Sequence, residues 1–210
     1  MGIFNLASTE MEMAAAKTQA RYDRIAPIYD GMEAVVERLA FRDWRQRLWS
    51  HVSGARLLEV GVGTGKNLPY HPDDVQITAV DLSARMLTRA QRKAHSLAGE
   101  VDLAQLDAQR MPFADDVFDE AVATFVFCSV PDPVQGLREI ARVVRPEGRV
   151  LLLEHVRVNA PLIGPLMDLL DPWIVRIMGA HIKRHTVENV KRAGLEVISV
   201  TSLAPGDLVK

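Results

Sequence analysis

The chain has 210 residues, of which 48% are hydrophobic and 25% charged, enough for one domain with its own core and too few for two. Its formal net charge of −2 argues against wholesale nucleic-acid binding, because the total charge offers nothing to attract a polyanion. The single cysteine, Cys128, excludes a disulfide framework and any zinc or iron–sulfur site built from several thiolates, and it fits a reducing compartment.

The N-terminal part of the chain is predicted to be helical. Residues 1–17 contain neither a basic region followed by an apolar run nor an apolar stretch long enough to span a membrane, so we expect a cytoplasmic protein. Helix-forming residues predict a first helix over 9–24, and amphipathic spacing predicts a second over 29–51. We expect Pro27 to interrupt the helical pattern between them.

Short apolar runs then alternate with helical stretches. Strands are predicted over residues 56–60, 76–80, 101–106, 120–127 and 148–156, with a loop and a helix between the first two. Strands and helices that alternate in this way specify an α/β fold, with a mostly parallel sheet and helices on both faces.

Capping signals mark the later helices. Asp132-Pro133 predicts a helix start, and Pro146-Glu147-Gly148 predicts its end and a turn. Near the end of the chain, residues 187–193 are predicted to be helical, with Thr186 as cap and Gly194 as stop, and residues 195–203 are predicted to form a strand.

A glycine cluster follows the first predicted strand, and ligands of open α/β sheets bind at the carboxyl ends of the strands. After Glu59, the glycines at 61, 63 and 65 permit a tight turn and let a ligand lie against bare backbone. A phosphate loop is excluded, because Lys66 comes one residue too early and Asn67 replaces the Ser or Thr that would hold magnesium.

Carboxylates stand at the next two strand ends. Asp81, twenty residues after Gly61, can accept both hydroxyls of a ribose, and Asp107, followed by Ala108, can accept a hydrogen bond from an adenine amine. The alternative for either aspartate is a helix cap, a common role for Asp at strand–helix junctions. Together with the glycines, the two carboxylates predict an adenosine site.

Four segments in this order, LLEVGVGTG, AVDLSARML, LDAQRMPFADDVFD and RPEGRVLLLEH, resemble the motifs of class I S-adenosylmethionine-dependent methyltransferases. The resemblance covers about Leu57 to His155 and implies a Rossmann-like fold, with S-adenosyl-L-methionine as cofactor and S-adenosyl-L-homocysteine as product. A nicotinamide dehydrogenase would prefer a glycine in place of Lys66. The resemblance implies these cofactor contacts: Glu59, Gly61, Gly63 and Gly65 around the methionine part, Asp81 at the ribose, Leu82 and Met86 beside the adenine, and Asp107 with Ala108 at its edge.

Residues 22–30, YDRIAPIYD, resemble the Y-D-x-x-A-x-x-Y-D segment of small-molecule and lipid methyltransferases, which folds over the cofactor as a lid. We therefore expect N-terminal lid helices over 1–52 and a methyltransferase core over 53–210, within one structural domain. Tyr22 is expected to be catalytic and Tyr29 to bind substrate, because aromatic rings attract a sulfonium or an alkylammonium. The alternative is that both tyrosines only pack in an amphipathic helix.

His155 follows the fifth predicted strand. An imidazole titrates near neutral pH, so we expect His155 to be catalytic and to take a proton from an amine or hydroxyl, directly or through water. It could equally be a capping or packing residue, with water taking the proton.

An apolar and basic insertion is predicted at about 157–185. Prolines and charged residues within its apolar part exclude a membrane-spanning helix. We expect the insertion to meet a membrane interface or to roof an apolar pocket; the alternative is a core helix with a solvated basic end. No metal is expected, because the histidines at 181 and 185 lack the Glu of H-E-x-x-H or a cysteine pair. The substrate-binding candidates of the insertion are Trp173, His181, Lys183, Arg184 and His185.

Together with the lid, this insertion makes nearly the whole chain similar to the bacterial phosphatidylethanolamine N-methyltransferases of the soluble, peripheral-membrane type. The resemblance implies stepwise N-methylation of phosphatidylethanolamine towards phosphatidylcholine by a peripherally membrane-associated enzyme whose partners are the phospholipid headgroup and the membrane surface. Two alternatives stay open: a C-methyltransferase of a quinone precursor, and a non-catalytic lipid-surface protein that binds S-adenosylmethionine.

Overall fold

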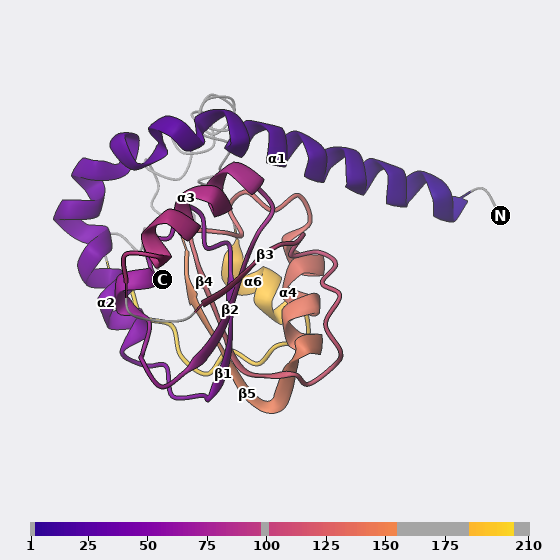
Figure 1. The fold of residues 1–210 in the computed structure, drawn as a ribbon. Coiled ribbons are helices and arrows are strands. Elements are labelled where there is room, and N and C mark those ends of the chain that lie inside the picture. Colours follow the sequence, from indigo (N-terminus) through magenta and orange to yellow (C-terminus); the bar gives the residue numbers. More distant parts are fainter. Residues whose placement is uncertain (1–2, 98–100, 155–184, 204–210) are drawn as a thin grey trace, which may run out of the picture.

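The computed structural model describes residues 3–97, 101–154 and 185–203. Its five strands form one sheet in the order β3-β2-β1-β4-β5, and every neighbouring pair is parallel. The carboxyl ends of the strands therefore meet at one edge of the sheet (Figure 1). The strands are β1 (Arg56–Val60), β2 (Gln76–Asp81), β3 (Val101–Gln105), β4 (Phe118–Thr124) and β5 (Val144–Leu153).

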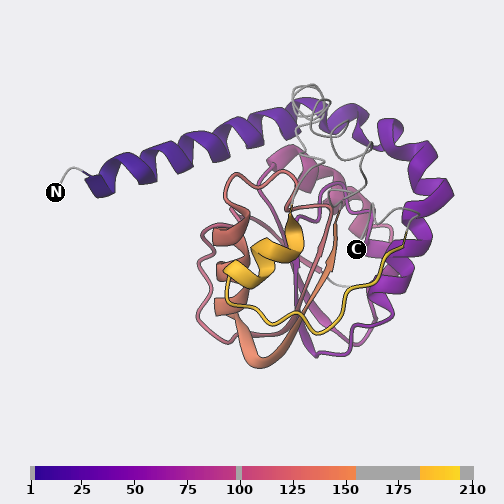
Figure 2. The same ribbon diagram turned by 180° about the vertical axis from the view of Figure 1, so that it is seen from behind.

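Helices cover both faces of the sheet, which confirms the predicted α/β, Rossmann-like architecture (Figures 1 and 2). Helices α2 (Arg42–Trp49) and α3 (Ala84–Ala94) pack on one face, and α4 (Pro133–Val143) and α6 (Thr186–Arg192) pack on the other. Side chains of β1 alternate between these faces. Leu57 joins the cluster around Trp49, whereas Leu58 joins the cluster with Leu137 and Ile140.

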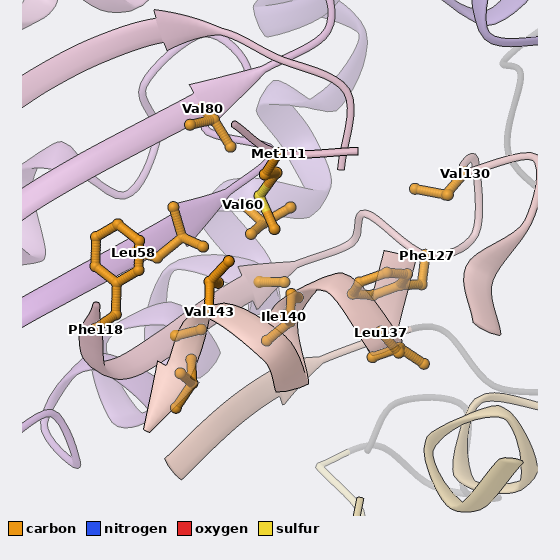
Figure 3. Packing of buried hydrophobic residues seen from close by; sticks show 13 residues of the cluster. Leu58, Val60, Val80, Met111, Phe118, Phe127, Val130, Leu137, Ile140 and Val143 are labelled. Atoms are coloured by element: carbon orange, nitrogen blue, oxygen red, sulfur yellow. The ribbon is translucent and has the colours of Figure 1, made fainter. Parts of the chain in front are cut away.

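The larger core lies under α4 (Figure 3). Leu137, Ile140 and Val143 recur at helical spacing, so they share the face that packs against the sheet. All three are fully buried. Burying a side chain of this kind contributes roughly 1.5–3 kcal/mol relative to leaving it exposed. This packing fixes the sheet whose edge carries the site.

Helix α1 (Ile3–Val36) runs across the carboxyl edge of the sheet, and its N-terminal part projects beyond the core (Figure 1). The predicted interruption at Pro27 is wrong, because α1 continues through it. Pro27 lacks the N–H that would bond to the carbonyl of Asp23, and that oxygen accepts from Nη1 of Arg85 at 3.4 Å instead. The α-helix ends at Val36, where the π-helical turn Glu37–Phe41 begins and leads into α2.

Two further predictions about helices and turns are wrong in detail. The connection between β1 and β2 holds only the 3-10 turn Leu68–Tyr70, where Pro69 and Pro72 interrupt any longer helix. Residues 146–148 lie within β5, not in a turn, at a break in register between the pairs Val144↔Phe118 and Arg149↔Glu120. Only glycine fits at Gly148, because a Cβ there would lie 2.5 Å from the carbonyl oxygen of Asp119.

The C-terminal predictions fare differently. Helix α6 is present, although Thr186 is its first residue and not its cap. Residues 195–203 do not form the predicted strand, since no other part of the described chain pairs with them, and Ile198 is 84% exposed. An apolar run becomes a strand only when a neighbour satisfies its backbone groups.

Candidate active site

A cavity lies at the carboxyl edge of the sheet, between the ends of β1 to β4 and helix α1. The structure brings most of the predicted site residues to its wall. They come from segments far apart in the sequence and meet because parallel strands end side by side. These residues are Tyr22, Tyr29, Gly61, Gly63, Asp81, Leu82, Met86, Asp107 and Ala108.

The turn after β1 presents bare backbone to the cavity. Gly61 and Gly63 adopt φ values of +73° and +56°, which favour glycine. The N–H of Gly61 donates to the carbonyl of Val80 at 2.7 Å, which ties the turn to β2. Gly65 has a different role, because it does not line the cavity and packs against Leu68 and Ala90.

Asp81 accepts hydrogen bonds from two different turns. Its Oδ2 accepts from the N–H of Gly63 at 2.9 Å, and its Oδ1 accepts from the N–H of Ser83 at 2.8 Å. Burial raises the pKa of Asp81 to about 6, helped by the charges of Glu59 and Asp23 and opposed by these two hydrogen bonds. Each carboxylate oxygen keeps a further lone pair, so Asp81 can also accept ribose hydroxyls.

Neither strand-end aspartate is a helix cap. Ser83 caps α3, because its Oγ accepts from the N–H of Met86 at 3.1 Å. Asp107 instead holds a turn, with Oδ1 accepting from the backbone N–H of Gln109 at 2.9 Å and both oxygens 3.1 Å from Nε2 of Gln109. The same residue lines the cavity, next to Ala108.

Glu59 lies behind the glycine turn and does not line the cavity. It is fully buried, with Oε1 accepting from Nδ2 of Asn67 at 2.7 Å and Oε2 2.8 Å from Nε2 of His71. The ring of His71 in turn packs against Trp49, with the ring centroids 4.5 Å apart. The expected contact of Glu59 with the methionine part of the cofactor stays a prediction.

Two tyrosines of α1 form one wall of the cavity. The ring centroids of Tyr22 and Tyr29 are 6.4 Å apart, and the rings are tilted by 56°. The continuous helix keeps these residues, seven positions apart, on one face. Between them Ala26 is 1% exposed, so no larger side chain separates α1 from the core there.

The aspartate that follows each tyrosine anchors α1 to the core, a role that the sequence analysis missed. Asp23 accepts at Oδ1 from the hydroxyl of Ser83, at 2.5 Å. Asp30 accepts at Oδ1 from the hydroxyl of Thr64, at 2.5 Å, while its Oδ2 lies 3.2 Å from Nζ of Lys93. The repeated Tyr-Asp pair was the available signal, because a seven-residue repeat places both aspartates on one helix face.

Burial alone would raise the pKa of Asp30. The hydrogen bond from Thr64 and the positive charge of Lys93 outweigh it, so the pKa of Asp30 lies below its usual value. The carboxylate therefore stays ionised at neutral pH and keeps both contacts.

Arg45 of α2 was also missed, although it lines the cavity. Its side chain is 6% exposed, its Nε donates to Oε1 of Glu37 at 3.1 Å, and its Nη1 donates to Asn67 and Thr124 at 2.8 Å each. The signal was an arginine four residues from both Phe41 and Trp49, on the apolar face of an amphipathic helix.

Several predicted residues lie outside the described part of the chain. Of the insertion candidates only His185 is described, and its Nδ1 lies 3.5 Å from Oε2 of Glu188 on the surface. The roles predicted for the others stay predictions: His155, Trp173, His181, Lys183 and Arg184.

Comparisons with known proteins agree with this geometry. Residues 58–152 match the family model of a methyltransferase domain. A phosphatidylethanolamine N-methyltransferase from Cereibacter sphaeroides is 37% identical over 175 residues, which span 78% of this chain and 82% of that protein. A ubiquinone/menaquinone biosynthesis C-methyltransferase from Geotalea daltonii is 35% identical over 147 residues, 66% of this chain and 63% of that protein.

Solved structures share the fold. The cyclase SpnF superposes with a TM-score of 0.71 over 90% of this chain and 75% of that one. Its sequence identity is 24%, so this likeness concerns the fold alone.

Proposed function

The chain belongs to the class I S-adenosylmethionine-dependent methyltransferases, and we propose that it methylates the amine of phosphatidylethanolamine, stepwise towards phosphatidylcholine. The observation that carries this proposal is the pair of tyrosine rings in the wall of the cavity that the glycine turn and Asp81 also line. Aromatic faces attract alkylammonium groups, which each round of N-methylation produces. The similarity to a phosphatidylethanolamine N-methyltransferase over 82% of its length supports the same substrate.

The cofactor supplies a methyl group on a positively charged sulfur. The amine nitrogen must be unprotonated to attack the methyl carbon, and the electron pair of the breaking carbon–sulfur bond stays on sulfur. In this proposal Asp81 and the glycine turn hold the cofactor, while Tyr22 orients the amine and Tyr29 contacts the headgroup. Holding the reactants in line can supply as much as roughly 7–11 kcal/mol of the barrier.

The remaining roles complete the proposal from the sequence. His155 takes the proton of the amine, directly or through water. The insertion, with Trp173 and its basic residues, meets the membrane surface and the lipid phosphate. Every helix within the described ranges falls short of the length or apolar character needed to cross a bilayer.

A second candidate is C-methylation of a quinone precursor, which the similarity to a C-methyltransferase from Geotalea daltonii favours. A quinone ring carries neither an amine nor a phosphate. The tyrosine pair would then stack on the ring, and the cations of the insertion would have no partner on the acceptor.

The test is incubation of the protein with labelled S-adenosylmethionine and detergent-dispersed phosphatidylethanolamine, beside a parallel reaction with demethylmenaquinone in the same detergent. We expect label in mono-, di- and trimethylated lipid and none in the quinone. Label in the quinone alone would move the assignment to the second candidate. Cofactor binding without transfer to either acceptor would reject both and favour a non-catalytic protein.

A further inference from the structure

The two ends of the cavity differ in charge. Asp81 and Asp107 line it at the ends of β2 and β3, whereas Arg45 and Lys66 line it beside β4 and the glycine turn. Glu37 lies between these two cations, with Oε1 3.1 Å from Nε of Arg45 and Oε2 3.5 Å from Nζ of Lys66. The cavity therefore suits a ligand with hydrogen-bond donors at one end and an anion at the other.

Arg45 is built into this wall. Three contacts fix its guanidinium, to Glu37, Asn67 and Thr124, and its Cζ lies 5.2 Å from the centroid of the Phe125 ring. Phe125 adopts a φ of +58°, which is rare for an aromatic residue and sets its ring beneath the guanidinium. A planar guanidinium held in this way is preorganised to bind an oxyanion.

One nitrogen of Arg45, Nη2, has no hydrogen-bond acceptor among the described residues. Within the described part of the chain, Nε and Nη1 make the hydrogen bonds of Arg45. Arg45 lines the cavity, and its side chain is 6% exposed. A charged donor that is nearly desolvated gains strongly from an ionised acceptor.

We propose that Nη2 of Arg45 binds an oxyanion of the ligand, the α-carboxylate of the cofactor. Strand order gives the direction. A cofactor whose adenine lies at Asp107 and whose ribose lies at Asp81 extends past β1 to β4, where Arg45 contacts Thr124. The phosphate of a lipid headgroup offers the same chemistry, so the experiment separates the two sources. The inference depends on the cofactor and its placement, not on the identity of the acceptor.

The test compares two ligands by titration calorimetry. S-adenosylhomocysteine carries the carboxylate, and methylthioadenosine has the same nucleoside and thioether without the amino-acid end. We expect Arg45→Gln to weaken binding of S-adenosylhomocysteine by about tenfold or more and binding of methylthioadenosine by less than about twofold. Arg47→Gln, at an exposed position of the same helix, is the matched control and should change neither.

If Arg45 has only a structural role, Arg45→Gln will bind both ligands more weakly and by the same factor, which overturns the proposal. Unchanged affinity for every ligand also overturns it. If Arg45→Gln does not fold, Arg45→Lys is tested instead, because it keeps the positive charge but lacks the planar set of N–H donors of the guanidinium. Selective weakening of S-adenosylhomocysteine in that variant supports the proposal, and equal weakening again rejects it. A third titration adds glycerophosphoethanolamine to the S-adenosylhomocysteine complex. If Arg45→Gln loses only the binding of glycerophosphoethanolamine, Arg45 still binds an oxyanion, but that oxyanion is the phosphate of the acceptor.

Discussion

Asp81 lines the cavity, and Asp30 accepts a hydrogen bond from Thr64, which also lines it, but the surroundings of the two carboxylates shift their pKa values in opposite directions. Burial raises the pKa of Asp81 to about 6, whereas Thr64 and Lys93 overcome the effect of burial on Asp30 and hold its pKa low. Asp81 therefore lacks donors that would fully satisfy its charge. The two hydroxyls of a ribose would supply them, so cofactor binding favours the ionised form of Asp81.

This linkage predicts a pH dependence for binding. Because the ionised form binds better, the affinity for S-adenosylhomocysteine should be constant above about pH 7 and should fall as the pH drops through about 6. Calorimetry between about pH 5 and pH 8 measures it. Asp81→Asn should bind more weakly at neutral pH and show no such fall. A pH dependence that persists unchanged in this variant would assign the titration to another group.

The hydroxyl of Tyr22 is predicted to act on the acceptor and not on the cofactor. Tyr22→Phe should slow methyl transfer by about tenfold or more, because an oriented donor or acceptor is lost, while the affinity for S-adenosylhomocysteine is kept. Steady-state rates with the accepted substrate and calorimetry check the two halves. Tyr70→Phe, outside the cavity, is the control. An unchanged rate would mean that Tyr22 only packs.

At the scale of elements, α1 is held over the site by a few polar contacts. Asp30→Asn removes the charge that pairs with Lys93, so we expect α1 to open more often. Hydrogen exchange over residues 22–31 should rise, with exchange in β1 and β4 unchanged. The exposed Glu12→Gln, on the same helix, should leave exchange over residues 22–31 unaltered. An equal rise throughout the sheet would indicate general destabilisation instead.

The glycine turn combines a binding role with a packing role. A Cβ at Gly65 would lie 2.5 Å from Cδ1 of Leu68 and 3.1 Å from Cα of Ala90, so Gly65→Ala should cost about 1–3 kcal/mol and lower the melting temperature by several degrees. Gly63→Ala meets no such overlap, although its φ of +56° still disfavours a side chain, so it should destabilise the fold less than Gly65→Ala and should act mainly on ligand binding. Thermal melts and calorimetry on both variants separate the roles. The reverse pattern would contradict this division.

Local signals were sufficient for β1, β2 and the glycine turn, because these strands are short apolar runs that end in glycines or an acid. The errors arose where the deciding partner is distant. The carbonyl of Asp23 that Pro27 leaves without its helical partner accepts from Arg85, and Arg45 donates to Asn67 and Thr124. The spacing of residues within α1 and α2 cannot predict these contacts, because the partners lie elsewhere in the sequence.

At the scale of the whole molecule, the site is a product of the entire sheet. Its wall draws on residues from Thr18 to Pro131, and the two clusters behind it share the strands between them. A ligand that contacts α1 and the ends of β1 to β4 therefore binds only when these elements are assembled. Binding should then stabilise all of them together.

S-adenosylhomocysteine at about one hundred times its dissociation constant should stabilise the fold by about 2.7 kcal/mol, which raises the melting temperature by roughly 5–10 °C for a chain of this size. Far-ultraviolet circular dichroism reports the helices and sheet, while tryptophan fluorescence includes Trp49, which is 2% exposed between α2 and the sheet. Both transitions should shift by the same amount. A shift seen by one probe alone would show that α2 unfolds separately from the sheet, and no shift at saturating ligand would contradict the assigned cofactor site.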